Sequence, residues 1–258
     1  MEAQDFANKL REAEINKSPI PPIREEIGIQ NINLAYQIQY LNTQHRVRNG
    51  ARIVGKKIGL TSKAVQKQLG VDQPDFGVLF HNMEILNEDS VSMQHLMQPK
   101  VEAEIAFVLG ADVIQENLTI VDIINSIDYA VPAIEIVGSR IEQWNIKITD
   151  TIADNASASH FVIGHTPKML DEFDVIKTKM QLSNNGELVS QGTGKNCLGS
   201  PLNAVLWLAK KMQEMNNPLR AGELIFSGAL GPMVNVIAGD HLHASFEGLG
   251  DVSVKFSE

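Results

Sequence analysis

Two glutamates inside an apolar segment constrain most strongly what this chain can fold into. Glu102 and Glu104 lie two residues apart in residues 100–110, a run that is otherwise mostly apolar and β-prone. Because a β-strand repeats every two residues, both carboxylates point to one face, and the opposite face reads as core. Neighbouring carboxylates on a half-buried strand repel each other and lose hydration. Either this face is open to water, or a cation compensates the charges.

A third glutamate has similar surroundings. Glu135 lies within the apolar residues 131–137. Three carboxylates that converge from strands would make an all-oxygen site suited to Mg²⁺ or Mn²⁺. The residues alone leave a second interpretation open, which is a metal-free β domain with a solvated acidic face.

The composition restricts the class of protein. The chain has 258 residues, of which 43% are hydrophobic and 21% charged, as in soluble globular proteins. Its net charge of −9 argues against a general nucleic-acid binder. We find neither a signal peptide nor an apolar run of about 18 residues, so we expect no membrane span and a cytoplasmic protein. Cys197 is the single cysteine, which excludes an internal disulfide.

The order of predicted elements indicates an α+β fold with mixed or antiparallel sheets rather than regular βαβ winding. Helical periodicity predicts an N-terminal helical lobe over residues 1–50, followed by a catalytic mixed-β domain over residues 51–258. Later helices are expected after the capping residues Ser62, Thr119 and Ser200. Strands are predicted at residues 51–60, 100–110, 129–137, 158–163 and 223–231, with a hairpin at 184–186 and antiparallel strands in 234–256.

Lys57 stands in the apolar strand predicted at residues 51–60. Its stem can pack while its amine reaches water, or the amine can act in a pocket as an acid/base group or an anion clamp. Residues 50–56 match the start of a phosphate-binding GxxxxGK pattern. Lys57 occupies the next position, where Ser or Thr must hold Mg²⁺, so we reject a nucleotide site.

Three further features are ambiguous when taken alone. Asp75 follows Pro74 and is expected in a loop, either as a turn former or as an acid/base group over a pocket. The glycine loop that ends residues 223–231 can present backbone N–H groups to a carboxylate. His241 and His243 share a strand face but have no third ligand nearby, so we interpret them as surface residues.

Six segments in a fixed order resemble the 2-keto-4-pentenoate hydratase family, also called the 2-hydroxypenta-2,4-dienoate hydratase family. This family belongs to the fumarylacetoacetate hydrolase C-terminal-domain superfamily. The resemblance extends from about residue 20 to the C-terminus, and it keeps the order and spacing of the motifs. The segments are residues 55–62, 70–77, 99–106, 132–140, 153–157 and 227–233.

The resemblance implies a fold and a set of site residues. The fold is the superfamily's mixed β-sandwich or β-roll with an N-terminal helical portion. A divalent metal, Mg²⁺ or Mn²⁺, is expected on Glu102, Glu104 and Glu135. Lys57 and Asp75 are the implied acid/base residues, and the sequence does not decide which is acid and which is base. The implied substrate-binding residues are Ser157, Ser227, Gly228 and Leu230.

The implied activity is a metal-dependent hydro-lyase that hydrates 2-hydroxypenta-2,4-dienoate to 4-hydroxy-2-oxopentanoate in the meta-cleavage degradation of aromatic compounds. The alternatives are a 4-oxalocrotonate decarboxylase, a longer-chain 2-oxo-dienoate hydratase and an inactive partner subunit. Decarboxylases tend to have Gly-Gly-Ile-Thr at residues 228–231 and Leu-Lys-Met-Gly at 56–59, and both differences favour the hydratase. The resemblance also implies a homo-oligomer and allows association with a downstream aldolase.

Overall fold

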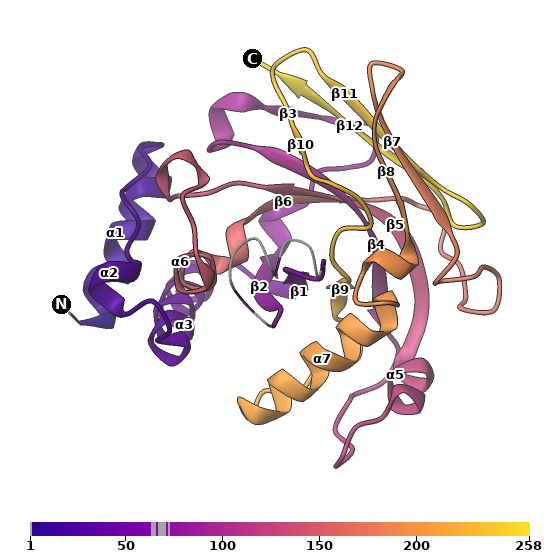
Figure 1. Ribbon diagram of the computed structural model, residues 1–258, viewed down its shortest axis with the longest axis horizontal. Helices are drawn as coiled ribbons and strands as arrows, with labels where there is room; N and C mark the ends of the chain where they lie inside the picture. Colours follow the sequence, from indigo (N-terminus) through magenta and orange to yellow (C-terminus); the bar gives the residue numbers. More distant parts are fainter. Residues whose placement is uncertain (1, 63–65, 67–70, 72) are drawn as a thin grey trace.

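The computed structural model describes residues 2–62, 66, 71 and 73–258 of the chain. The short helix predicted after Ser62 falls mostly on residues outside this description. In the described residues the fold is α+β, as expected, with helices at the N-terminus and two curled sheets (Figure 1).

Three helices form the N-terminal part of the structure: α1 (Ala3–Asn16), α2 (Arg24–Ile27) and α3 (Ile32–Arg48). Asn31 caps α3, because its side chain accepts a hydrogen bond from the Leu34 amide. These helices lie on one side of the sheets (Figure 1, indigo), and their buried side chains belong to the same apolar cluster as residues of both sheets. The division into domains at residue 50 stays a prediction.

The larger sheet contains the strands that carry the candidate site residues Lys57, Glu102, Glu104 and Glu135. Its strand order is β2-β1-β9-β4-β5-β6, and β10 pairs with β4. The neighbours are antiparallel except β1 and β9, which run parallel. Its strands are β1 (Ile53–Gly59), β2 (Asp75–Phe80), β4 (Lys100–Leu109), β5 (Ile127–Val137), β6 (Ala158–Ile163), β9 (Leu224–Phe226) and β10 (Val234–Asn235).

The second sheet has the order β3-β12-β11-β7-β8 and covers the other side of the molecule (Figure 1). The hairpin predicted from residues 184–186 joins β7 to β8, and the C-terminal residues form β10, β11 and β12, so both predictions are confirmed. Alternating burial along β11 shows one face on the core and one outside. The strands are β3 (Ser90–Ser92), β7 (Lys179–Asn184), β8 (Glu187–Thr193), β11 (His241–Phe246) and β12 (Gly250–Ser257).

Helices and 3₁₀ turns fill the connections. Thr119 and Ser200 cap α5 and α7 as predicted, and Pro201 occupies the first turn of α7. The helix α6 was not predicted. It forms because the carboxylate of Asp150 accepts from the Lys147 amide at the start of the helix. These elements are η1 (His81–Met83), η2 (Met93–His95), α5 (Ile120–Ser126), η3 (Glu142–Trp144), α6 (Ile148–Ala153), η4 (Asn155–Ser157), η5 (Gly194–Asn196) and α7 (Pro201–Glu214).

The helix α3 is tied to the large sheet at strand β2. The ring of Tyr36 stacks on Phe76, with ring centroids 4.7 Å apart. The side-chain amide of Gln39 donates to the carbonyls of Phe76 and Ile152 at 2.8 and 3.0 Å. A stacked aromatic pair is worth about 0.5–1.5 kcal/mol beyond its burial, so α3 helps to fix the start of β2.

No helix among the described residues is long and apolar enough to cross a membrane.

Candidate active site and metal centre

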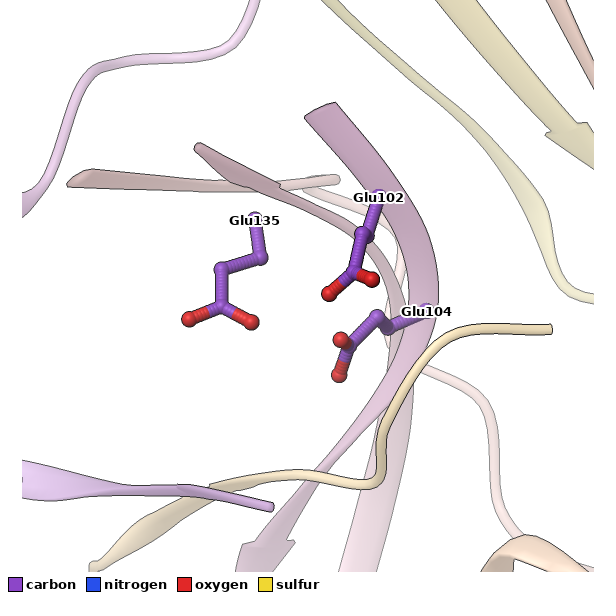
Figure 2. Close-up of side chains that lie close together, drawn as sticks. All are labelled: Glu102, Glu104 and Glu135. Carbon is purple, nitrogen blue, oxygen red and sulfur yellow. The ribbon is translucent and has the colours of Figure 1, made fainter. Parts of the chain in front are cut away.

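The three glutamates converge on one face of the large sheet. Glu102 on β4 lies directly opposite Glu135 on the antiparallel strand β5, and Glu104 follows two residues along β4. Cross-strand partners point to the same face, so the pairing brings in the third carboxylate. Figure 2 shows the three side chains turned toward one another, and one oxygen from each lies within 4.8 Å of the others.

The carboxylates are buried with incomplete hydrogen bonding. Glu104 and Glu135 are fully buried and Glu102 is half-buried. Among the described residues, Glu104 Oε1 and both Glu135 oxygens accept no hydrogen bond of good geometry. Burial raises the pKa of all three, that of Glu135 to about 7, although the nearby lysine opposes the shift. Orphaned carboxylate oxygens in a close cluster fit a hard divalent cation, which prefers oxygen ligands.

Lys57 enters this cluster from β1. Its Nζ lies 3.1 Å from Glu135 Oε2, and both side chains are almost completely buried. Burial alone would lower the pKa of this lysine, but the charges of the surrounding carboxylates, Glu135 first, raise it instead. Lys57 is therefore held as a cation. Together with one divalent cation it balances the charges of the three glutamates, which further supports a metal of charge two.

Asp75 joins the same face from β2. It was expected in a loop, but it is the first residue of the strand, paired with Gly59 of β1. The expectation failed because pairing with β1 overrides the turn preference of the residues around Pro74. Asp75 Oδ2 accepts from Thr151 at 3.0 Å, whereas Oδ1 has no hydrogen-bond partner among the described residues. Burial raises its pKa, and Lys57 opposes this rise.

The lack of a side chain at Gly59 makes room for the Asp75 carboxyl group. A Cβ on Gly59 would lie 2.2 Å from Asp75 Oδ1 and 3.6 Å from Lys57 Nζ. The two groups therefore face the same small space above Gly59. The sequence analysis assigned no role to this glycine. Thr151 was also missed, because a threonine within a small-residue segment carries no signal of its own.

Ser157 is the last residue of η4 and follows Ala156, which contacts Lys57. Its Oγ is buried and has no hydrogen-bond partner in the described part of the chain. The preceding carbonyl, that of Ala156, accepts from Lys57 Nζ at 2.9 Å. A buried hydroxyl with free donor and acceptor capacity beside a charged cluster is suited to a polar ligand. The substrate-binding role of Ser157 stays a prediction.

The glycine loop after β9 supports Glu104. As expected, the loop presents a backbone N–H group to a carboxylate, but this carboxylate belongs to the protein itself. The Gly228 amide donates to Glu104 Oε2 at 2.7 Å. Gly228 has a φ of +102°, and a Cβ there would collide with Thr61. Ser227 and Leu230 are fully buried beside it, and their amides bond to β4. The substrate contacts expected from these three residues stay predictions.

Two other features lie apart from the carboxylate cluster. His241 is exposed and His243 pairs with Asp251 at 3.1 Å, as expected for surface residues. A cavity of about 540 Å³ lies behind η4, lined by residues of α1 and α3 that include Arg46, and by Arg140. None of the three glutamates lines this cavity, so we do not assign it to the metal site.

Comparison with known proteins identifies similar chains. Residues 40–257 match the family described as fumarylacetoacetate (FAA) hydrolase C-terminal. The chain is 51% identical to a TodF product hydratase from Pseudomonas putida, over 98% of this chain and 94% of that protein. It is likewise 51% identical to a 2-keto-4-pentenoate hydratase from Paraburkholderia xenovorans, with the same coverage.

A solved structure has the same architecture over nearly the whole chain. It is the 4-oxalocrotonate decarboxylase from Pseudomonas putida G7, complexed with magnesium and adipate. The TM-score is 0.95 at 32% sequence identity, and the match covers 98% of this chain and 97% of that one. This similarity confirms the fold expected from the sequence.

Proposed function

We propose the function of this chain from the premise that it belongs to the fumarylacetoacetate hydrolase C-terminal family and, within it, to the 2-keto-4-pentenoate hydratases: it is a hydro-lyase that adds water to 2-hydroxypenta-2,4-dienoate. The product is 4-hydroxy-2-oxopentanoate, an intermediate in the breakdown of aromatic compounds. The observation that carries the proposal is the convergence of Glu102, Glu104, Glu135 and Lys57 on one buried face.

The glutamates hold a divalent cation, Mg²⁺ or Mn²⁺, which the relatives' chemistry and the oxygen donors both favour. When bound, the cation supplies Lewis-acid stabilisation of negative charge on the substrate's 2-oxygen. The chain's own contribution to this arrangement is the set of buried, converging carboxylates. The Gly228 amide fixes one of them, Glu104, from behind.

Lys57 acts as the positive group of the pocket. Since the surrounding carboxylates raise the pKa of its amine, it enters the reaction protonated. Its fixed position, with an ion pair to Glu135 and a hydrogen bond to the Ala156 carbonyl, lets it stabilise negative charge that develops on the dienoate or donate a proton to carbon. We assign to Ser157 a neutral hydrogen bond to the substrate, because its buried Oγ has no hydrogen-bond partner among the described residues.

Asp75 is the second proton-transfer group. Its free Oδ1 and its raised pKa let it exchange a proton at the space above Gly59. The reaction needs four proton movements. The dienol gains a proton at its terminal carbon and loses the one on its 2-hydroxyl. Water then adds at C4 and loses a proton, and C3 gains one. We assign the proton from water to Asp75, which Thr151 orients.

A spectrophotometric assay tests the function. Purified protein is incubated with 2-hydroxypenta-2,4-dienoate, and the loss of the dienoate absorbance is followed with Mg²⁺, with Mn²⁺ and with chelator. We expect turnover that needs the metal and yields 4-hydroxy-2-oxopentanoate. Full turnover in chelator after exhaustive metal removal contradicts the metal site, and no turnover under any condition contradicts the hydratase.

The decarboxylase is the competing activity, because a decarboxylase has the same fold at 32% identity. The higher identity to hydratases, 51% over nearly the whole chain, favours hydration. Incubation with 2-oxohex-3-enedioate separates the two activities, since only decarboxylation releases CO₂. The length and substituents of the preferred dienoate are resolved by comparing kcat/KM among homologous substrates.

The proposal extends to assembly. The N-terminal helices expose Ile15, Tyr40 and Val47, which favours a homo-oligomer. We place this oligomer in the cytoplasm, where a downstream aldolase can associate with it. Light scattering after size exclusion tests the oligomer. Co-elution with a purified aldolase that consumes 4-hydroxy-2-oxo acids tests the association.

A further inference from the structure

The segment Asn155–Ser157 has an unusual backbone. All three residues have positive φ, at +53°, +49° and +58°, although none is glycine. L-residues rarely adopt this region, and of the three only asparagine tolerates it well. Such a run persists only where surrounding contacts impose it. The contacts that hold η4 therefore determine where its carbonyl and hydroxyl groups lie.

Packing supports the segment unevenly. Ala156 and Ser157 are buried, whereas Asn155 and the flanking residues Asp154 and Ala158 line the cavity of about 540 Å³. On the side of Asn155, therefore, polar contacts are the evident means of holding η4 in place.

Arg140 holds the two ends of the segment. Its backbone amide and its guanidinium bind the side chain of Asp154, and the guanidinium also donates to the carbonyls of Asp154 and Ala158. Both members of this ion pair are buried. A buried arginine with this many acceptors fixes the flanks of η4, and its hydrogen bonds within the described residues go to these flanks rather than to the three residues with positive φ.

The side chain of Asn155 attaches η4 to strand β2. Its Oδ1 accepts from the Val78 amide at 2.8 Å, and its Nδ2 donates to the Val78 carbonyl at 3.0 Å. The side chain thus pairs with strand β2 as another strand would. Next to it, a Cβ on Gly77 would lie 2.3 Å from the Asn155 carbonyl oxygen, so the glycine permits this close approach.

This attachment point lies beside the proposed acid/base residues. In the β1–β2 ladder, Lys57 pairs with Gly77, and Asp75 lies two residues before Gly77. Asn155 therefore ties η4 to the strand pair that carries both groups. One residue later, the Ala156 carbonyl accepts from Lys57 Nζ at 2.9 Å, and the next residue is Ser157.

We propose that Asn155 is a positioning residue: by pairing its side chain with the backbone of Val78, it holds η4 in the left-handed conformation that places the Ala156 carbonyl on Lys57 and the Ser157 hydroxyl in the site. Within the described residues, both hydrogen bonds of the Asn155 side chain go to the Val78 backbone rather than to a metal ligand or a proton-transfer group. Its kinetic consequence rests on the proposed function, whereas its structural consequence does not.

The test uses two substitutions at one position, and both variants are measured in the metal-loaded state. Asn155→Gly removes the side-chain bonds but accepts positive φ, and Asn155→Ala removes the bonds and also disfavours that φ. The matched control is Asn87→Ala. It removes an asparagine side chain that accepts from a strand amide, that of Ser253 at 2.8 Å, in the other sheet.

Two readouts are measured on folded protein. The first is kcat and KM for 2-hydroxypenta-2,4-dienoate. Misplacement of a catalytic group by about 1 Å costs on the order of 100-fold, so we expect kcat to fall about 10- to 100-fold in Asn155→Gly and further in Asn155→Ala. We expect the Mn²⁺ affinity, followed by electron paramagnetic resonance of free Mn²⁺, to change much less, because the three metal ligands lie on other strands.

The second readout is amide hydrogen exchange, which needs no activity. The Gly138 amide donates to the Ser157 carbonyl at 2.8 Å, so displacement of η4 exposes it. We expect faster exchange at Gly138 in both Asn155 variants, with the second sheet unchanged. Asn87→Ala should leave kcat and the exchange of Gly138 unchanged.

Three outcomes decide the question. Wild-type kcat in Asn155→Gly would show that only the φ preference matters, and it would overturn the proposal. Unchanged exchange at Gly138 also overturns it. If the wild-type enzyme does not hydrate the dienoate, the proposed function fails, and the exchange of Gly138 alone then decides whether Asn155 positions η4.

Discussion

Lys56 and Lys57 are adjacent on β1, and both are buried, yet their surroundings differ. Lys56 Nζ pairs with Glu223 at 2.6 Å, one cation with one anion at the edge of solvent. Lys57 points to the opposite face and is surrounded by the charges of Glu135 and three further carboxylates. Strand type, residue type and burial are the same for both lysines. The excess of negative charge around Lys57 is what marks its face as a site.

The comparison teaches how to distinguish a structural ion pair from a reactive cluster. A buried pair that balances its own charge needs nothing more, and breaking it costs about 3–5 kcal/mol of stability. A buried cluster with excess charge costs stability as it stands, and proteins retain such clusters mainly where function requires them. Substitutions on the two faces of β1 should therefore affect different measured quantities.

The largest expected difference is between Lys57→Met and Lys56→Met. Removing one acid/base group costs roughly 100- to 10,000-fold in rate, so Lys57→Met should lose that much kcat. Lys56→Met leaves Glu223 unpaired but at the edge of solvent, so we expect a lower melting temperature and nearly unchanged kcat. The measurements are dienoate turnover and thermal unfolding. Equal kcat losses in the two variants would refute the assignment of Lys57.

The partner carboxylates give the second contrast, in metal affinity. Substitution of groups that merely support a metal ligand costs about 10- to 100-fold in affinity, so Glu135→Gln, which removes a ligand charge, should cost at least that much. Glu223→Gln removes the partner of Lys56 and should leave affinity unchanged. Titration with Mn²⁺ measures both. Unaltered Mn²⁺ binding by Glu135→Gln, Glu102→Gln and Glu104→Gln means that the three-carboxylate site is wrong.

Two glycines of β1 provide a third contrast. A Cβ on Gly59 meets the flexible carboxyl end of Asp75, whereas a Cβ on Gly55 would lie 1.8 Å from the Leu224 backbone oxygen. Gly59→Ala should therefore displace Asp75 and lower kcat about tenfold or more, within the range for a misplaced acid/base group, with a modest change in stability. Gly55→Ala should instead lower the melting temperature and the yield of folded protein.

If Gly59→Ala keeps wild-type kcat, Asp75 does not act from the space above Gly59. The pair of variants is informative because both add one methyl group to the same strand. Only the contacted atoms differ, a side-chain carboxyl in one case and a neighbouring backbone in the other.

The sequence predicted the individual residues of this site better than their convergence in space. The two-residue period placed Glu102 and Glu104 on one face, because strand alternation is local. Their convergence with Glu135 depends on the register between β4 and β5, which distant residues determine, and here the family resemblance supplied what the spacing could not. The same resemblance gave the fold.

Other features had no local signal. The loop predicted around Asp75 proved to be a strand, because pairing with β1 overrides the turn preference of the residues around Pro74. The helix α6 was missed because its stability comes largely from Asp150, whose carboxylate accepts from the Ile23 and Arg24 amides as well as from the helix start. The positive φ of Ala156 could not be read from an alanine.

The smallest expected effect concerns pH and separates the two faces once more. Burial raises the pKa of Glu135 to about 7, so the folded metal-free protein binds this proton more tightly than the unfolded chain. The stability that this group contributes is therefore present below the ordinary glutamate pKa and is lost as pH rises through about 7. Thermal unfolding in chelator should show a melting temperature that declines over this window.

His160 acts in the opposite direction, since burial lowers its pKa to about 4, whereas burial raises the pKa of Asp154 to about 6, in the same direction as Glu135. The wild-type curve therefore contains several contributions. The slope is best read as the difference between wild type and Glu135→Gln, in which His160 remains and the Glu135 contribution is gone. We expect the variant's melting temperature to depend less on pH, whereas Glu223→Gln on the Lys56 face should follow the wild type. Because Mg²⁺ competes with protons for the same oxygens, added Mg²⁺ should stabilise the wild type more above pH about 7 than below it. A wild-type melting temperature that rises with pH as steeply as in Glu135→Gln means that Glu135 binds no proton in this range.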